Sequence, residues 1–311
     1  MTDRKKISIV IPAYNEEASL PRLIEDIETV LCNTRYAYNF IIIDDGSTDG
    51  TLACLRRLAQ NDKNIHYISL SRNFGHQNAL LCGIKHSDGD CVLMLDADFQ
   101  HPPEKIPQMI EKWAEGFQLV YMTRDDSASS NIFKKATSSM FYKLMNYISD
   151  VQLEYGVADF RIIDKTVVNE IKKIDDPNLF LRGLIHWLGF SAYKISYQPA
   201  PRLLGSSKYN LRRMLSLAFD GITSFSIKPL YLSTLFGSLF SMLAFLYASY
   251  ALYAYFFTDK ALPGWASIII SVLFIGGVQL IMMGVMGVYL GKLFIQSKRR
   301  PCYIIKESSC K

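Results

Sequence analysis

Short apolar runs alternate with amphipathic segments in the first third of the chain. Apolar runs at 7–12, 40–45, 65–71 and 91–95 are typical of buried strands. The segments between them repeat apolar residues at the spacing of one helix face. Strands that alternate with helices form βαβ units, and continuous apolar strands suit a parallel sheet that is covered on both faces. The pattern therefore predicts an α/β domain with a doubly wound, mostly parallel sheet.

The pattern loosens after residue 105. Apolar runs at 118–123 and 157–163 indicate two further strands, and 193–199 is a third candidate. Segments 131–148 and 209–228 repeat apolar residues at helical spacing and carry Lys and Arg on their other faces. Basic amphipathic helices of this kind lie in a membrane interface, so we expect two interfacial helices. The alternative is that they pack against the domain.

Two long segments near the C-terminus carry no charge. Residues 229–257 are uncharged over 29 positions and residues 265–291 over 27. At about 1.5 Å per residue each helix would reach roughly 40 Å, which exceeds the ~30 Å hydrocarbon core of a bilayer. We therefore expect a two-helix transmembrane hairpin. The alternative is a pair of helices buried in a large soluble core.

Basic residues cluster on both sides of this hairpin. The positive-inside bias then places a first domain at 1–208 and a basic tail at 292–311 on the cytoplasmic side of the inner membrane. The net charge of +5 is modest. The clustering of basic residues beside the hairpin favours anionic lipid headgroups over nucleic acid as a partner. The six cysteines show no metal-binding spacing, which is typical of reduced thiols.

Acidic pairs follow two of the apolar runs. Asp44 and Asp45 end the second run, and Asp96 and Asp98 follow the fourth. Ligands of such sheets bind at the carboxyl ends of the strands. Side chains two apart on an extended chain point the same way, so Asp96 and Asp98 would repel each other unless a divalent cation or water lies between them. The sequence DDGSTDG also suits a turn. The sequence lacks GxGxxG, the fingerprint of dinucleotide binding, which argues against a dehydrogenase.

Six motifs occur in a fixed order ahead of the hairpin: IVIPAYNEE, IIDDGSTDGT, SRNFGHQNAL, LDADFQHPPE, ADFRI and GSSKY. In this order they resemble the polyprenyl-phosphate glycosyltransferases, family-2 enzymes with the GT-A fold that include bactoprenol glucosyltransferases and dolichyl-phosphate mannose synthases. The resemblance covers nearly the whole chain. It implies transfer of a sugar from a nucleotide to a polyprenyl phosphate, such as undecaprenyl phosphate, in the membrane.

The resemblance also implies a metal site and a donor site. Asp96, Asp98 and Gln100 match ligands of Mg²⁺ or Mn²⁺, hard ions that suit oxygen ligands and offset the charge of a departing diphosphate. The residues implied to bind the nucleotide sugar are Pro12, Ala13, Tyr14, Glu16, Asp44, Asp45, Arg72 and Asp96.

Asp159 in ADFRI matches the position of the family's proposed base. Positioning the donor sugar is an equal alternative, because a phosphate acceptor has a second pKa of about 6 and needs no strong base. The basic residues suited to hold the lipid phosphate or the departing diphosphate are Arg124, Lys134, Lys135, Arg202 and Lys208. We expect Arg124 and Lys208 to act in catalysis together with Asp98 and Asp159.

The segment EYGVADFRI and the second apolar helix look closest to bactoprenol glucosyltransferases, which favours UDP-glucose as the donor. The alternatives are GDP-mannose or an amino-sugar nucleotide as donor, and a noncatalytic membrane sensor of nucleotide sugars. Small residues along the hairpin allow helices to approach closely, within one chain or between subunits. The resemblance implies a homo-oligomer, with a tetramer as one form.

Overall fold

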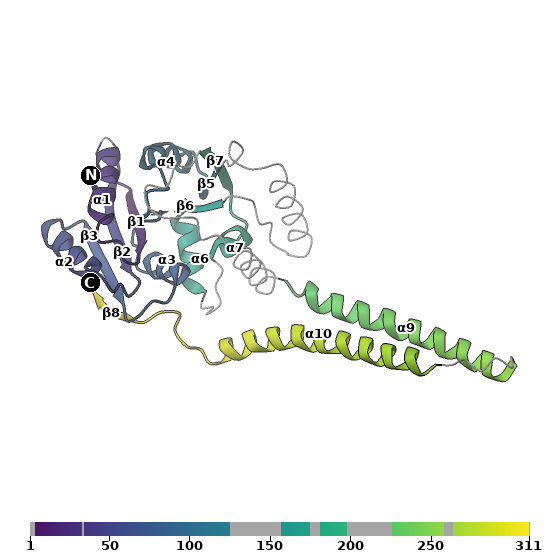
Figure 1. Cartoon of the computed structure of the whole chain (residues 1–311). Helices are drawn as coiled ribbons and strands as arrows, with labels where there is room; N and C mark the ends of the chain where they lie inside the picture. Colours follow the sequence, from purple (N-terminus) through teal and green to yellow (C-terminus); the bar gives the residue numbers. More distant parts are fainter. Residues whose placement is uncertain are drawn as a thin grey trace.

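A computed structural model describes residues 4–32, 34–124, 157–174, 181–197, 226–257 and 264–310. A mixed sheet with helices on both faces forms one domain, and two long helices project from it (Figure 1). The predicted strands are confirmed as β1 (Lys6–Ala13), β2 (Ala37–Asp44), β3 (Ile65–Leu70), β4 (Cys91–Met94), β5 (Leu119–Arg124), β6 (Val157–Asp164) and β7 (Ala192–Tyr197). The domain's helices are α1 (Leu20–Leu31), α2 (Thr51–Asn61), α3 (His76–Lys85), η1 (Pro103–Lys105), α4 (Ile106–Ala114), α6 (Lys165–Lys173) and α7 (Leu181–Trp187).

The sheet has the strand order β7-β5-β6-β4-β1-β2-β3-β8. Strands β1 to β4 form a parallel block, as the apolar runs predicted. Strand β6 runs antiparallel to β4 and to β5, which the sequence analysis did not predict. In the register of β4 with β6, Met94 is opposite Arg161. The start of β6, which includes Asp159, therefore lies beside the residues that follow the carboxyl end of β4.

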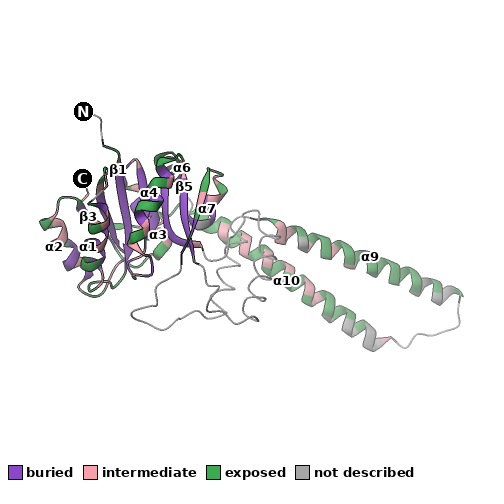
Figure 2. Ribbon diagram, turned by 90° about the horizontal axis from the view of Figure 1, so that it is seen from above, coloured by how far each residue is buried: buried purple, intermediate pink, exposed green. Residues whose placement is uncertain are grey.

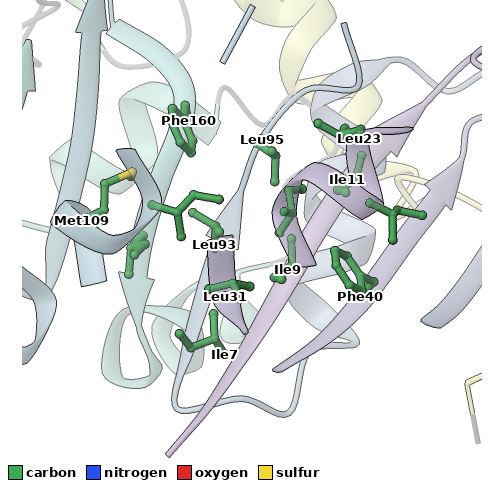
Figure 3. Close-up of a cluster of buried hydrophobic side chains, with 14 of the residues drawn as sticks. Ile7, Ile9, Ile11, Leu23, Leu31, Phe40, Leu93, Leu95, Met109 and Phe160 are labelled. Carbon is green, nitrogen blue, oxygen red and sulfur yellow. The ribbon is translucent and has the colours of Figure 1, made fainter. Parts of the chain in front are cut away.

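Apolar side chains fill both faces of the sheet because neighbouring residues of a strand point to opposite sides. On β1, Ile9 packs in a cluster with Phe40 and Leu93 on one face, whereas Val10 packs with Ile41 on the other. Figure 3 shows the first of these clusters, with side chains of α1 and α4 closing over the strands. Strands β1 to β6 are mostly buried (Figure 2) and hold the loops at their ends in place.

Helices α9 (Lys228–Phe257) and α10 (Trp265–Ser297) form the hairpin and lie side by side in both views (Figures 1 and 2). The rings of Phe240 and Phe274 are 5.3 Å apart, edge to face, and the Tyr289 hydroxyl donates to the Ser226 carbonyl oxygen at 2.7 Å. Each helix has a stretch long and apolar enough to cross a membrane, and neither stretch is buried in the domain. The alternative of helices buried in a soluble core is therefore wrong for the described structure.

Helix α10 runs on to Ser297, past the predicted end at 291. The prediction stopped at the first charge, Lys292, but a single lysine does not end a helix, because its long side chain can reach toward a polar surface. A side chain added at Gly277, Gly284 or Gly287 would meet nothing within 4 Å in the described residues. Packing within the hairpin therefore does not use these glycines, and a role between subunits stays a prediction.

The end of the chain returns to the domain as β8 (Ile305–Ser308), which pairs antiparallel with β3. Arg56 donates from Nε to Glu307 Oε1 at 2.8 Å, and the backbone N–H of Ser71 donates to the Ile304 carbonyl oxygen at 2.9 Å. The expected basic tail at 292–311 thus contains the end of α10 and an edge strand. Sequence analysis missed β8 because it is short, mostly exposed and lacks an apolar run.

Truncation after Arg300 is expected to destabilise the domain, because it removes β8 and leaves the backbone groups of β3 unpaired at the edge of the sheet. We expect the midpoint of thermal unfolding to fall by several degrees, since each lost kcal/mol is worth roughly 2–4 °C in a domain of this size. Glu307→Gln is the matched control. It keeps the strand and weakens the half-exposed ion pair with Arg56, so its midpoint should fall by about 1–2 °C at most. An unchanged midpoint after truncation would mean that β8 contributes nothing.

Candidate active site

A cavity of about 220 Å³ opens at the carboxyl ends of β1 and β2. Four of the residues expected to bind the nucleotide sugar line it, and the lining consists of Pro12, Ala13, Tyr14, Asp45, Asn73, Gly75, His76 and Ala79. The remaining wall comes from the loop after β3, where the sequence analysis expected Arg72 at the donor site, and from the start of α3. The cavity joins the ends of three parallel strands, as expected for a ligand site of such a sheet.

Asp45 fastens the loop that forms this second wall. Its Oδ1 accepts the N–H of Phe74 at 2.7 Å, and its Oδ2 accepts the N–H of Gly75 at 2.9 Å. Burial raises the pKa of Asp45, an effect that these two N–H groups partly offset. The neighbouring Gly46 has a φ of +69°, and a Cβ there would lie 2.4 Å from the backbone of Arg72. The two loops therefore pack backbone to backbone.

Asp44 is buried and accepts hydrogen bonds from the Ser47 N–H at 2.9 Å and the Ser69 hydroxyl at 2.7 Å. These contacts hold the turn, in agreement with the alternative reading of DDGSTDG. Arg72 is exposed, donates to the Asn73 carbonyl oxygen at 3.0 Å and lies 4.1 Å from the centre of the Phe74 ring. Neither Asp44 nor Arg72 lines the cavity, so their roles in binding the donor stay predictions.

The acidic loop begins where β4 ends at Met94. We expected Asp96 and Asp98 to face one spot because they would lie on an extended chain, but Ala97 and Asp98 form a turn and Phe99 has a φ of +58°. Asp98 is exposed and accepts the backbone N–H of Gln100 at 3.1 Å and its side-chain amide at 2.7 Å. A turn, rather than strand alternation, therefore sets the direction of the Asp98 carboxylate.

Asp96 and Asp159 meet at His76, the first residue of α3. The His76 Nε2 atom lies 3.3 Å from Asp96 Oδ1 and 3.2 Å from Asp159 Oδ2. These three side chains could offer ligand atoms to one metal ion, since the atoms all lie within 4.8 Å of one another. The antiparallel register of β4 with β6 explains the approach of Asp159, because it sets the start of β6 beside the acidic loop.

Asp159 also forms a buried ion pair. Its Oδ1 accepts from Arg161 Nη2 at 3.0 Å, and the two side chains are only 2% and 1% exposed. The same Nη2 atom donates to the Ala158 carbonyl oxygen at 3.0 Å. Gln77 Nε2 approaches Asp159 Oδ2 at 3.5 Å. Arg161 therefore holds one oxygen of the carboxylate, and His76 and Gln77 lie close to the other.

Glu16, in the loop after β1, is close enough to several acidic side chains for their charges to change its pKa. Burial raises its pKa, the Ser19 hydroxyl lowers it, and the charges of Asp98, Asp49 and Asp96 raise it further. The site thus gathers several carboxylates in one electrostatic environment, which favours binding of a cation.

Several expected site residues lie outside the described part of the chain: Lys134, Lys135, Arg202 and Lys208. Arg124 ends β5, but its side chain is not described. The two expected interfacial helices, 131–148 and 209–228, also fall on segments that are wholly or almost wholly outside it. The residues expected on the acceptor side of the site therefore stay predictions.

Sequence analysis missed His76, His101 and Arg161. The signal for His76 was its place directly after SRNFG, the segment in which the third apolar run ends. Arg161 stands two residues after Asp159 on one strand, and hence on the same face. A charged pair in an otherwise apolar run is a signal that could have been read.

Comparisons with known proteins agree with this architecture. The model of "Glycosyl transferase family 2" matches residues 8–172, which include the cavity and the acidic loop. The chain therefore belongs to glycosyl transferase family 2, and it is a glycosyltransferase with the GT-A fold.

Similar proteins match over nearly the full length. The chain is 39% identical to an uncharacterized glycosyltransferase of Bacillus subtilis, over 99% of this chain and 95% of that protein. It is 39% identical to a bactoprenol glucosyl transferase of Shigella phage SfV, over 98% of this chain and all of that protein. A mannosyltransferase structure from Pyrobaculum calidifontis, in complex with GDP-Man and Mn²⁺, is 15% identical with a TM-score of 0.49, covering 95% of this chain and 87% of that one.

Proposed function

We propose that the protein transfers glucose from UDP-glucose to the phosphate of a membrane polyprenyl phosphate. The observation that supports this most is the similarity to bactoprenol glucosyl transferases, which spans both the sheet domain and the two apolar helices. A site on a domain attached to a membrane hairpin suits a water-soluble donor and a lipid acceptor. The basic flanks of the hairpin favour the cytoplasmic side for this domain.

The oxygen ligands that the acidic loop offers fit a divalent cation. Asp96 and Asp98 are oxygen ligands of the kind that Mg²⁺ and Mn²⁺ prefer. Burial raises the pKa of Glu16, and the nearby charges of Asp98 and Asp96 contribute to the rise. We propose that Asp96, Asp98 and Gln100 hold the ion. When bound, it supplies positive charge that stabilises the departing diphosphate. Asp159 is a less suitable ligand, because Arg161 already neutralises it.

The transfer is one displacement. An oxygen of the lipid phosphate attacks the anomeric carbon of glucose, the new C–O bond forms as the bond to the diphosphate oxygen breaks, and UDP leaves. This inverts the configuration, from an α-linked donor to a β-linked lipid phosphate. Much of a phosphate ester is dianionic at neutral pH, so the attacking oxygen needs no proton removed.

The geometry favours a positioning role for Asp159. A general base must reach the proton that it removes with a lone pair that other donors do not occupy. Here Oδ1 is held by Arg161 and Oδ2 lies close to His76 and Gln77. We therefore propose that Asp159 orients the sugar hydroxyls and the side chain of His76, and that Pro12, Ala13, Tyr14 and Asp45 form the nucleotide pocket.

Transfer of radiolabelled sugar into extracted lipid tests this function. Membranes that contain the protein are supplied with UDP-glucose, GDP-mannose or UDP-N-acetylglucosamine in separate reactions, and the label in polyprenyl phosphate is counted. We expect label from UDP-glucose alone. Label from GDP-mannose or the amino sugar instead would overturn the choice of donor, and no label from any donor would overturn transfer to lipid. A product with retained anomeric configuration would contradict the single displacement.

A further inference from the structure

His101 occupies a fixed place between the acidic loop and the second half of the sheet. It follows Gln100 and is 1% exposed. Its ring stacks on Phe160 of β6, with centroids 5.2 Å apart and an interplanar angle of 9°, and meets the edge of Tyr197 of β7 at 6.5 Å. Phe160 and Tyr197 are themselves buried. The position of the imidazole is therefore set by aromatic packing that lies outside the acidic loop.

The two ring nitrogens of His101 both face Asp96. The backbone N–H of Asp96 donates to Nδ1 at 3.1 Å, so Nδ1 acts as an acceptor and has no proton. A neutral imidazole then has its proton on Nε2. This N–H group lies 3.7 Å from Asp96 Oδ2, beyond hydrogen-bond distance, with its positive end near the negative oxygen. One ring thus fixes the backbone of Asp96 by a hydrogen bond and presents a polar N–H group toward its carboxylate.

Each carboxylate oxygen of Asp96 faces a different imidazole. Oδ1 lies 3.3 Å from His76 Nε2, and Oδ2 lies nearest His101. The His76 side chain is 41% exposed and borders the cavity, whereas that of His101 is fully buried. A ligand in the cavity can therefore reach His76, whereas the ring of His101 is shielded from it.

We propose that His101 is a positioning residue that presets the direction of the Asp96 carboxylate and thereby raises the affinity of the site for a divalent cation. The inference rests on the proposed function, because it takes Asp96 as a ligand of that cation. Residues that orient metal ligands through hydrogen bonds typically change metal affinity by about 10–100-fold when they are replaced. A change of this size is expected here.

Direct titration with Mn²⁺ tests the proposal on the full-length protein in detergent, with saturating UDP in every sample. Free Mn²⁺ is measured by electron paramagnetic resonance. His101→Phe keeps the stacking on Phe160 and removes both polar contacts, so its Mn²⁺ dissociation constant should rise by about 10–100-fold. His101→Gln keeps a donor near the Nε2 position, so it should bind Mn²⁺ more weakly than the wild type but more tightly than His101→Phe.

His86→Phe is the matched control. The Nδ1 atom of His86 also contacts a backbone atom, the Cys82 carbonyl oxygen at 2.8 Å, and the ring lies 6.4 Å from that of Tyr303, far along α3 from the acidic loop. This variant should bind Mn²⁺ like the wild type. Wild-type affinity in His101→Phe, or an equal loss in His86→Phe, would overturn the proposal.

A second readout separates positioning from damage to the fold. With Mn²⁺ saturating, kcat of His101→Gln should recover toward the wild-type value, while the Mn²⁺ concentration for half-maximal rate stays raised. A lowered kcat with an unchanged Mn²⁺ requirement would overturn the proposal. If His101→Phe does not fold, wild-type Mn²⁺ affinity in His101→Gln would also overturn it. Failure of the wild type to label any lipid would count against the proposed function, whereas these titrations would still measure the effect of His101.

Discussion

Replacing Asp98 with asparagine is expected to lower the rate of glucose transfer at least about a hundredfold, because the cation at the diphosphate contributes several kcal/mol to the transition state and each 1.36 kcal/mol is tenfold in rate. Asparagine retains an oxygen that can accept the N–H of Gln100, which Asp98 accepts at 3.1 Å. The change therefore removes charge and leaves the turn in place. The rate is measured as radiolabelled glucose that enters polyprenyl phosphate.

Asp98→Ala removes the hydrogen bonds as well as the charge, and should be equally inactive. Asp26→Asn is the control, since Asp26 lies on the surface of α1 in an exposed pair with Arg22 at 4.0 Å. It should transfer at the wild-type rate. If Asp98→Asn stays active while Asp98→Ala fails, the side chain serves the turn and not the cation. Asp159→Asn should retain more activity than Asp98→Asn, because a phosphate acceptor does not depend on a base.

Replacing Arg161 with alanine is expected to lower the free energy of unfolding by about 3–5 kcal/mol, the usual cost of leaving one partner of a buried ion pair without the other. Arg161 and Asp159 are 1% and 2% exposed and lie 3.0 Å apart, so water cannot replace the guanidinium without opening the core. The measurement is denaturant unfolding of the detergent-solubilised protein, followed by near-ultraviolet circular dichroism.

Two further variants separate charge from packing at this pair. Asp159→Asn combined with Arg161→Met removes both charges and fills much of the volume, so it should recover part of the stability lost in Arg161→Ala. Lys173→Ala removes one partner of an exposed pair with Glu170 at 2.6 Å and should cost less than about 0.5 kcal/mol. A loss in Arg161→Ala no larger than that of Lys173→Ala would contradict the account of a buried pair.

The parallel half of the fold could be predicted because its strands are buried on both faces and therefore appear as continuous apolar runs. The runs at 7–12 and 91–95 correspond to β1 and β4 within a residue. Strand β8 could not be predicted in this way, because a short, exposed edge strand is stabilised by backbone pairing with β3 rather than by apolar side chains. Its composition is that of a loop.

The gathering of residues at the ends of the parallel strands could be predicted better than the meeting of side chains between β4 and β6. Asp45 and Tyr14 lie just after the ends of adjacent parallel strands, and the carboxyl ends of parallel strands share one edge of the sheet. The meeting of His76, Asp96 and Asp159 depends on the antiparallel register of β4 with β6, which no local pattern encodes. Likewise His101 looked like part of a loop, and its packing against Phe160 exists only after β6 joins the sheet.

Removal of divalent cations tests the central claim most directly, namely that a bound ion offsets the acidic charge at Asp96 and Asp98 so that the sugar can leave its nucleotide. The protein is treated with EDTA, freed of chelator and assayed for glucose transfer to polyprenyl phosphate, with and without added Mg²⁺ or Mn²⁺. We expect the rate to fall by at least about a hundredfold and to return when either ion is added. An undiminished rate in the stripped protein would contradict the account.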